Sequence, residues 1–308
     1  MTAPSVIVII GDDLAASLIQ HTPEIVAMQA QGATFTNFIV SNSWCSPSRA
    51  SMFTGRFPHS TGIFANAGAG GGYGGYHGAA LDEETYATIA EAVGYRTVFL
   101  GKYINNFNPA IHAVAPGFSA PDWHASDDGF GGFNWDSGSV GDVTSYGAAE
   151  EDYCTDVLAG LAVDAIETTP LETPLLMVLS TFAPHEPSVP APRHDALFGS
   201  LAYPGIALPS WDFRPSETDP EWLQAVPALA NPSGSGQTSN YRDMARSMQA
   251  VSDAIAAINA ETFYGHVKFA PGGQINSLQP PVLQLVGGKP VVLWPDAIKS
   301  GELRFLPK

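Results

Sequence analysis

Strand-like and helical patterns alternate along most of the chain. Four short runs rich in apolar and β-branched residues predict strands, and the first of them, VIVII, is apolar enough for a strand buried on both faces. Between these runs, apolar residues recur at helical spacing. The predicted strands are residues 6–10, 34–40, 96–101 and 174–180, and the predicted helices are residues 23–31, 82–93, 154–166 and 241–258.

Two of the predicted helices carry residues that mark their ends. Thr22 is placed as an N-cap with Pro23 at the first helical position and Gly32 beyond the last turn, and Gly94 ends the second helix. The resulting β-α-β-α order predicts the α/β class, with a mostly parallel sheet and helices on both of its faces.

Three long segments without a clear period predict functional loops, at residues 66–80, 104–150 and 185–237. In the first of them, the glycine-rich run 70–75 satisfies G-x-G-x-x-G. Because no strand precedes this run and no helix opens directly after it, we expect a flexible loop near a substrate entrance rather than a dinucleotide site.

The end of the chain differs in character from the rest. It is β-rich and punctuated by glycine and proline, and the runs PPVLQLV and KPVVLWP flank Gly287-Gly288, which predicts a β-hairpin. We therefore expect an α/β domain over residues 1–259 and a short β-rich tail over residues 260–308.

The composition indicates a globular protein and limits its partners. The chain has 308 residues, of which 45% are hydrophobic and 14% charged. A formal net charge of −17 argues against nucleic acid and anionic membrane surfaces as partners. No apolar run is long enough for a membrane-spanning helix. The first strand starts at residue 6, so we expect either a cytosolic protein without a signal peptide or a chain whose true start lies upstream.

An acidic pair, Asp12 and Asp13, directly follows the first predicted strand. Ligands bind at the carboxyl ends of parallel strands, so both side chains are expected to face a crevice. Adjacent carboxylates repel each other unless a cation lies between them, and such hard oxygen ligands suit Ca²⁺ or Mg²⁺. The alternative, a pair that caps a helix, stays open on these residues alone.

Cys45 is one of only two cysteines and lies in the segment SNSWCSPSRASMFTGR. No second Cys or His has the spacing of a zinc site. A thiol nucleophile is one interpretation, because Arg49 and the N-terminus of a following helix would lower the thiol pKa. A buried structural cysteine is the other. The second cysteine, Cys154, opens a helix and is most simply a small buried side chain.

The string Cys-Ser-Pro-Ser-Arg at residues 45–49 resembles the signature of the type I, formylglycine-dependent sulfatases. Further matches follow in the order of that family, from residue 5 to about residue 258: the Asp pair, Gly101-Lys102-Tyr103, Phe182-Ala183-Pro184-His185, Pro192-Arg193-His194 and Tyr241-Arg242-Asp243. Gly-Lys-Tyr is typical of the N-acetylglucosamine-6-sulfatase-like branch. The resemblance implies an alkaline-phosphatase-like fold and hydrolysis of a sulfate monoester, on a sulfated carbohydrate or an aryl sulfate.

The resemblance also implies a catalytic set. In the family, a formylglycine-generating enzyme oxidises the cysteine that Cys45 matches. A hydrated aldehyde carries two hydroxyls, so one can attack sulfur while the other allows sulfate to leave. Arg49 is expected to bind this hydroxyl, Lys102 to point its ammonium into the crevice, and His185 to contact sulfate or protonate the alcohol. Taken singly, Lys102 and His185 are more simply solvated side chains, and their roles depend on their positions at strand ends together with Cys45.

The implied metal site is incomplete in this chain. Asp12, Asp13 and the diol derived from Cys45 match ligands of Ca²⁺ in the family. Family members continue to a further strand that ends in Asp-Asn-Gly and completes the shell, and then to a later lysine that binds sulfate. From Glu261 onward no such match exists. Residues 261–297 instead resemble the C-terminal end of periplasmic amino-acid- or amide-binding proteins of ABC transporters. We therefore expect a truncated sulfatase domain with a foreign tail.

Other functions remain to be weighed against sulfate-ester hydrolysis. A catalytically impaired remnant of the sulfatase fold would explain the missing ligands. A solute-binding protein would explain the tail, but the tail is too short to hold a binding cleft. A related phosphohydrolase would need Ser or Thr in place of Cys45. Members of the resembled family are usually exported, whereas we expect no signal peptide before the first strand of this chain.

Overall fold

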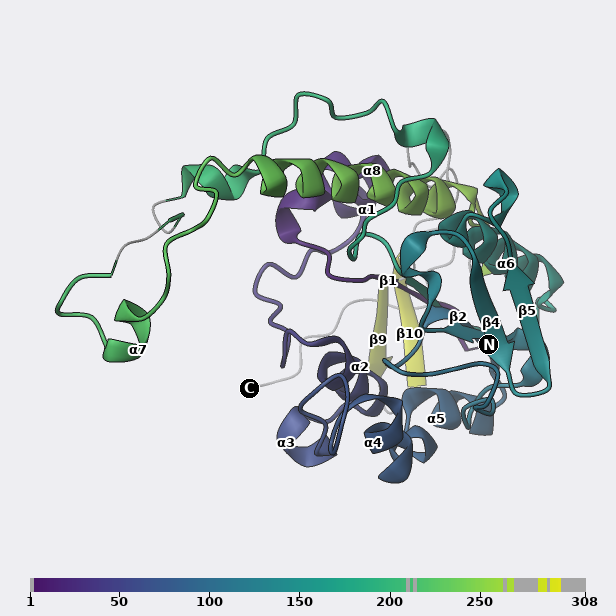
Figure 1. The fold of residues 1–308 in the computed structure, drawn as a ribbon. Coiled ribbons are helices and arrows are strands. Elements are labelled where there is room, and N and C mark those ends of the chain that lie inside the picture. The colour runs from purple at the N-terminus through teal and green to yellow at the C-terminus, as the bar shows by residue number, and fades with distance from the viewer. Residues whose placement is uncertain are drawn as a thin grey trace.

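The structure is a computed structural model of the chain, and it describes residues 3–208, 211–212, 215–262, 265–268, 282–286 and 289–294. Figure 1 shows a central sheet between two layers of helices. The predicted class, a mostly parallel sheet with helices on both faces, is therefore confirmed. In the described part of the chain, no helix is both long enough and apolar enough to cross a bilayer.

Four parallel strands form the central sheet in the order β1-β6-β2-β3. Their bounds are β1 (Val6–Gly11), β2 (Arg96–Lys102), β3 (Trp123–Ser126) and β6 (Leu175–Thr181). Strand β6 is buried along its whole length and β2 along all but its first residue, which accounts for their apolar sequences. Strand β1 has an equally apolar sequence but is only partly buried, so the expectation of a buried first strand is met only in part.

One helix layer contains α1 (Pro23–Gln31), α6 (Cys154–Thr168) and α8 (Ser235–Ala257). As predicted, α1 begins with Thr22 as its N-cap and ends at Gly32. Leu158 of α6 packs with Met177 and Leu179 of β6 in one buried cluster. Helix α6 therefore covers the face of the sheet opposite to the face that α2 covers.

The other layer contains α2 (Cys45–Thr54), α3 (Pro58–Thr61), α4 (Gly72–Gly78) and α5 (Tyr86–Ala92). The expectation of a flexible loop at residues 70–75 is wrong, because α4 begins there. Tyr73 and Tyr76 of α4 are buried in the aromatic core, and a Cβ on Gly71 would lie 2.4 Å from a backbone oxygen. Tight packing here outweighs the poor helix propensity of glycine.

Residues 34–40 do not form the predicted strand. Their apolar side chains are exposed, with Phe35 at 80%, Phe38 at 77% and Ile39 at 85% of full accessibility. A strand needs a hydrogen-bonded neighbour, and in the described sheet β1 pairs only with β6. The segment thus has strand-like composition without a partner strand beside it.

Smaller elements complete the fold. Strands β4 (Trp135–Ser139) and β5 (Asp142–Tyr146) form an antiparallel pair within the segment expected to be a loop. The short helix α7 spans Glu221–Gln224. The 3₁₀ helices span Ala16–His21, Leu81–Glu83, Ala120–Asp122, Gly129–Gly131, Glu150–Asp152, Pro192–His194 and Pro204–Ala207.

The tail contains two antiparallel pairs, β7 (Asn259–Thr262) with β8 (Gly265–Lys268), and β9 (Val282–Val286) with β10 (Lys289–Trp294). Pairing of β9 with β10 confirms the predicted hairpin strands, while the turn at Gly287-Gly288 lies outside the described residues. The boundary between a domain of residues 1–259 and a tail of residues 260–308 stays a prediction.

Candidate active site

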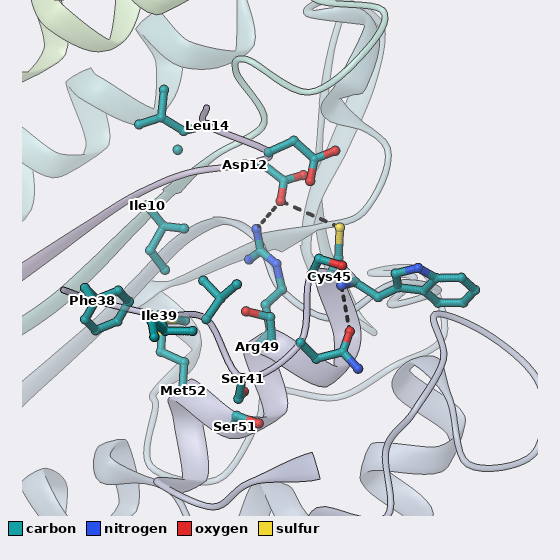
Figure 2. Close-up of a pocket in the computed structure, with 17 residues that line it drawn as sticks. Ile10, Asp12, Leu14, Phe38, Ile39, Ser41, Cys45, Arg49, Ser51 and Met52 are labelled. Carbon is teal, nitrogen blue, oxygen red and sulfur yellow. Dashed lines mark hydrogen bonds and ion pairs between the residues drawn. The ribbon is translucent and has the colours of Figure 1, made fainter. Parts of the chain in front are cut away.

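The carboxyl ends of the central strands and the N-terminus of α2 meet at one edge of the sheet. Asp12 follows β1, Lys102 ends β2 and His185 follows β6, while Cys45 and Arg49 lie one turn apart on α2. A cavity of about 570 Å³ opens here, with Asp12, Asp13, Cys45 and Arg49 among its lining residues. Figure 2 shows Arg49 and Cys45 both directed toward the Asp12 carboxylate.

Asp12 is the centre of this cluster. Its Oδ1 accepts a hydrogen bond from Nη2 of Arg49 at 3.0 Å, and its Oδ2 accepts one from Nζ of Lys102 at 2.5 Å. Burial would raise the pKa of Asp12, but the charges of Arg49 and Lys102 outweigh burial and hold this pKa below its ordinary value. Asp12 is therefore an ionised, buried carboxylate that balances two buried cations.

Arg49 also ties α2 to the ends of two strands. Its Nη1 donates to the backbone oxygen of Lys102 at 2.6 Å and to the hydroxyl of Ser180 at 2.8 Å. Ser180 in turn donates to the same Lys102 oxygen at 2.7 Å. A planar guanidinium with five donors suits this crossing point, where a lysine could not make the same set of bonds.

Lys102 has no exposed side-chain surface. Besides Asp12, its ammonium donates to Sγ of Cys45 at 3.4 Å and lies 4.5 Å from the centre of the Phe130 ring. The preceding residue, Gly101, has φ of +97°, and a Cβ there would lie 2.1 Å from the backbone oxygen of Ser180. Only glycine therefore fits directly before Lys102 in β2.

The second acidic residue and the histidine form a more exposed pair. Nε2 of His185 lies 3.4 Å from Oδ2 of Asp13, with 29% and 49% of the two side chains exposed. Nδ1 of His185 lies 2.6 Å from the backbone oxygen of Glu186. Asp13 has φ of +57°, a left-handed conformation, two residues after the end of β1. The two acidic residues thus have different surroundings.

The Cys45 thiol is not activated in this environment. Burial and the Asp12 charge raise the pKa of the thiol, and the opposing effect of Lys102 is smaller. The idea that Arg49 and the helix N-terminus lower this pKa is therefore wrong. A protonated thiol is a poor nucleophile, which weighs against direct thiol chemistry. Cys154 is a buried free cysteine, in accord with its expected structural role.

The first turn of α2 is held by a side chain from another segment. The Asn66 side-chain oxygen accepts the N–H of Ser46 at 2.9 Å, and the Ser46 hydroxyl donates to Asn105 at 2.8 Å. Gly55, with φ of +70°, ends the helix. These bonds fix the position of Cys45 relative to β2.

Two residues near the site were not predicted from the sequence. Ser180 holds Arg49, and its position as a polar residue at the end of an apolar strand was a usable signal. Asp127 follows β3; its Oδ2 accepts the N–H of Asn106 at 2.5 Å, and its buried Oδ1 has no hydrogen-bond partner among the described residues. Burial raises the pKa of Asp127 to about 6.

The acidic pair fits a hard divalent cation in part. Ligand atoms of Asp12, Cys45 and His185 lie within 4.8 Å of one another, and Asp13 lies beside them. Two carboxylates suit Ca²⁺, whereas a thiol sulfur and an imidazole nitrogen do not, and Ca²⁺ takes six to eight oxygens. The described residues thus provide only the beginning of an oxygen shell.

Comparison with known proteins decides the family. The sulfatase family matches residues 4–261, which is most of the chain. The chain belongs to the sulfatase family. The resemblance to sulfatases inferred from the residues around Cys45 is confirmed, and the relatives that match include proteins named N-acetylglucosamine-6-sulfatase. The individual roles expected of Cys45, Arg49, Lys102, His185, Asp12 and Asp13 stay predictions.

Curated sulfatases that match the chain are considerably longer. N-acetylglucosamine-6-sulfatase of Homo sapiens is 27% identical over 263 residues, which cover 82% of this chain and 47% of the human protein. N-acetylglucosamine-6-O-sulfatase of Bacteroides thetaiotaomicron is 26% identical over 215 residues, covering 65% of this chain and 34% of that protein. The chain thus spans less than half the length of these relatives.

Solved sulfatase structures confirm the alkaline-phosphatase-like fold. A structure with D-glucosamine-2-N,6-O-disulfate as its substrate has a TM-score of 0.55 and 21% identity, covering 82% of this chain and 52% of the other. A sulfatase of Pseudoalteromonas sp. has a TM-score of 0.54 and 16% identity, covering 83% and 51%. At these identities the comparison carries the fold alone.

Proposed function

We propose that the chain hydrolyses the sulfate ester of a sulfated amino sugar, using a formylglycine made from Cys45. The observation that carries this proposal is the cluster in which Asp12 contacts Cys45, Arg49 and Lys102. Family membership and relatives named N-acetylglucosamine-6-sulfatase support the substrate class. The substrate found with one structural neighbour, a glucosamine disulfate, is of the same class.

The residues of the site suit this chemistry. Hydrated formylglycine, when present, supplies one hydroxyl to attack sulfur and a second whose deprotonation lets sulfate leave. Arg49 and Lys102 provide local positive charge for the sulfate in a protein of net charge −17. His185 is partly exposed beside Asp13, which lines the cavity, and from there it can give a proton to the departing alcohol.

Asp12 and Asp13 would hold a divalent cation, which we propose is Ca²⁺. Two carboxylates are part of the six to eight oxygens that Ca²⁺ requires, so affinity is expected to be low. The same shortage supports a second candidate function, a sulfatase-fold protein with little or no turnover. The choice between the two candidates depends on activity rather than on fold.

Thiol counting and mass spectrometry test the formylglycine proposal. The protein is coexpressed with a formylglycine-generating enzyme. No Lys or Arg precedes Arg49, so trypsin releases residues 1–49 as one peptide. We expect this peptide to lose the thiol and react with a hydroxylamine probe. Cys154, counted under denaturing conditions, is the internal control that stays a thiol. A Cys45 that remains a thiol would contradict the proposal.

Turnover of glucosamine 6-sulfate and of an aryl sulfate then separates the two candidate functions. The modified protein with added Ca²⁺ is compared with Cys45→Ala, which removes the nucleophile but fills no new space. Activity that Cys45→Ala abolishes supports the hydrolase. Complete modification of Cys45 with turnover equal to that of Cys45→Ala supports the impaired remnant.

A further inference from the structure

The first strand of the sheet has an open edge. Among the described strands, β1 is the last in the order β1-β6-β2-β3, so one side of its backbone has no strand partner there. Val6 is 43% exposed and the rest of β1 is only partly buried, whereas every residue of β6 is buried. An apolar strand with an unpaired edge is a template for another strand.

An apolar groove runs beside this edge. Its volume is about 590 Å³, and it lies between β1, helices α1 and α8, and residues 32–35. The walls are mainly apolar and include Ile7, Ile9, Met28, Val251, Ile255 and Ile258. Open backbone groups along one side and apolar side chains along the other are the features that bind an added β-strand.

We propose that the hairpin of β9 and β10 docks on the free edge of β1, with β9 next to β1. The chain enters the tail at Ile258, which follows α8 and lines the groove, so the tail starts at the binding surface. Residues 269–281, which come between β8 and β9 in the chain, then provide enough length to bring β9 back along β1. Strand β9 has five residues against six in β1, and its sequence VLQLV is nearly as apolar as VIVII.

The register of the hairpin indicates which strand lies inside. Leu285 pairs with Pro290, which has no N–H, so this pair is of the non-hydrogen-bonded kind. Leu285 and Leu283 therefore direct their N–H groups away from β10, toward the side that β1 would occupy. Proline is confined to outer strands of sheets, which places β10 at the new edge.

Charge also favours the tail as the occupant over a second copy of the chain. Residues 260–308 carry five Lys or Arg and three Asp or Glu, a net charge of +2. Because the whole chain has a net charge of −17, residues 1–259 have a net charge of −19. The tail is attracted to such a surface, whereas a second copy adds another −17 and is repelled.

Hydrogen exchange on the full chain tests this docking. The peptide containing Val6–Gly11 is followed in the unaltered protein and in Leu285→Pro, which removes an N–H aimed away from β10. Leu283→Asp keeps its N–H but adds a charge to the strand that would lie beside the apolar groove. Ala297→Pro, in the same tail but beyond β10, is the matched control. Exchange of the β2 peptide verifies that the central sheet stays folded.

We expect β1 to exchange roughly tenfold faster or more in Leu285→Pro and Leu283→Asp, with no change in Ala297→Pro or in β2. Equal exchange of β1 in all four proteins would overturn the proposal. Protection of β1 that rises with protein concentration, together with a doubled mass in solution, would also overturn it, because a second copy would then be the occupant.

Discussion

Replacing Asp12 by Asn should destabilise the protein far more than replacing Asp13 by Asn. The two substitutions are chemically identical and lie next to each other, but Asp12 is buried and Asp13 is about half exposed. Asp12→Asn leaves the side chains of Arg49 and Lys102, which are 4% and 0% exposed, without their shared counter-ion.

The magnitude follows from this burial. Removing one partner of a buried ion pair costs about 3–5 kcal/mol, because the remaining charge is uncompensated. Asp12 serves two cations, so we expect a loss of about 3–5 kcal/mol or more for Asp12→Asn. The only ion pair of Asp13 among the described residues is with His185 at 3.4 Å, and a half-exposed pair is worth about 0–1 kcal/mol.

Urea denaturation in the presence of a chelator measures both effects without a contribution from bound metal. A double-mutant cycle with Lys102→Met isolates the Asp12–Lys102 interaction, and we expect a coupling of about 1–3 kcal/mol. Equal stability of Asp12→Asn and Asp13→Asn, or additive effects in the cycle, would refute the view that Asp12 compensates buried charge.

Three further predictions follow from the same region. Asp127→Asn should stabilise the protein by about 1–3 kcal/mol at pH 7 and have little effect at pH 4. The pKa of Asp127 is raised to about 6, so ionisation of this carboxyl above pH 6 lowers the stability of the folded protein. Midpoints of urea denaturation measured across this pH range test the prediction. Gly101→Ala should cost several kcal/mol, seen as a loss of soluble or folded protein, since its Cβ would meet the Ser180 oxygen. Calorimetric titration should show weak Ca²⁺ binding that Asp13→Asn weakens further; tight binding would show that other oxygens complete the shell.

Much of the site could be predicted because its residues sit where strands end. Asp12 and Lys102 follow or end apolar runs, and the pattern from Cys45 to Arg49 is specific. Ser180 also ends such a run and could have been found by the same rule. Asp127 could not, because β3 is four residues long and lies in a segment rich in glycine and aspartate without a strand period.

The errors in the predicted fold have a different cause. Residues 34–40 have the composition of a strand, but a strand depends on a neighbour, which a local pattern does not reveal. Residues 72–78 have the composition of a loop, but burial of Tyr73 and Tyr76 makes them a helix. In both cases contacts distant in sequence decided the conformation.

The pairing of β1 with β6 has a consequence for the order of events during synthesis. Val6 pairs with Leu176 and Gly11 with Thr181, so the first strand has no place in the sheet until the ribosome has made residue 181. Cys45 is made roughly 140 residues earlier. At 5–20 residues per second, about 7–30 s pass before the residues around Asp12 can assemble. During that interval Cys45 belongs to an unassembled chain and is accessible to any enzyme that acts on the growing polypeptide.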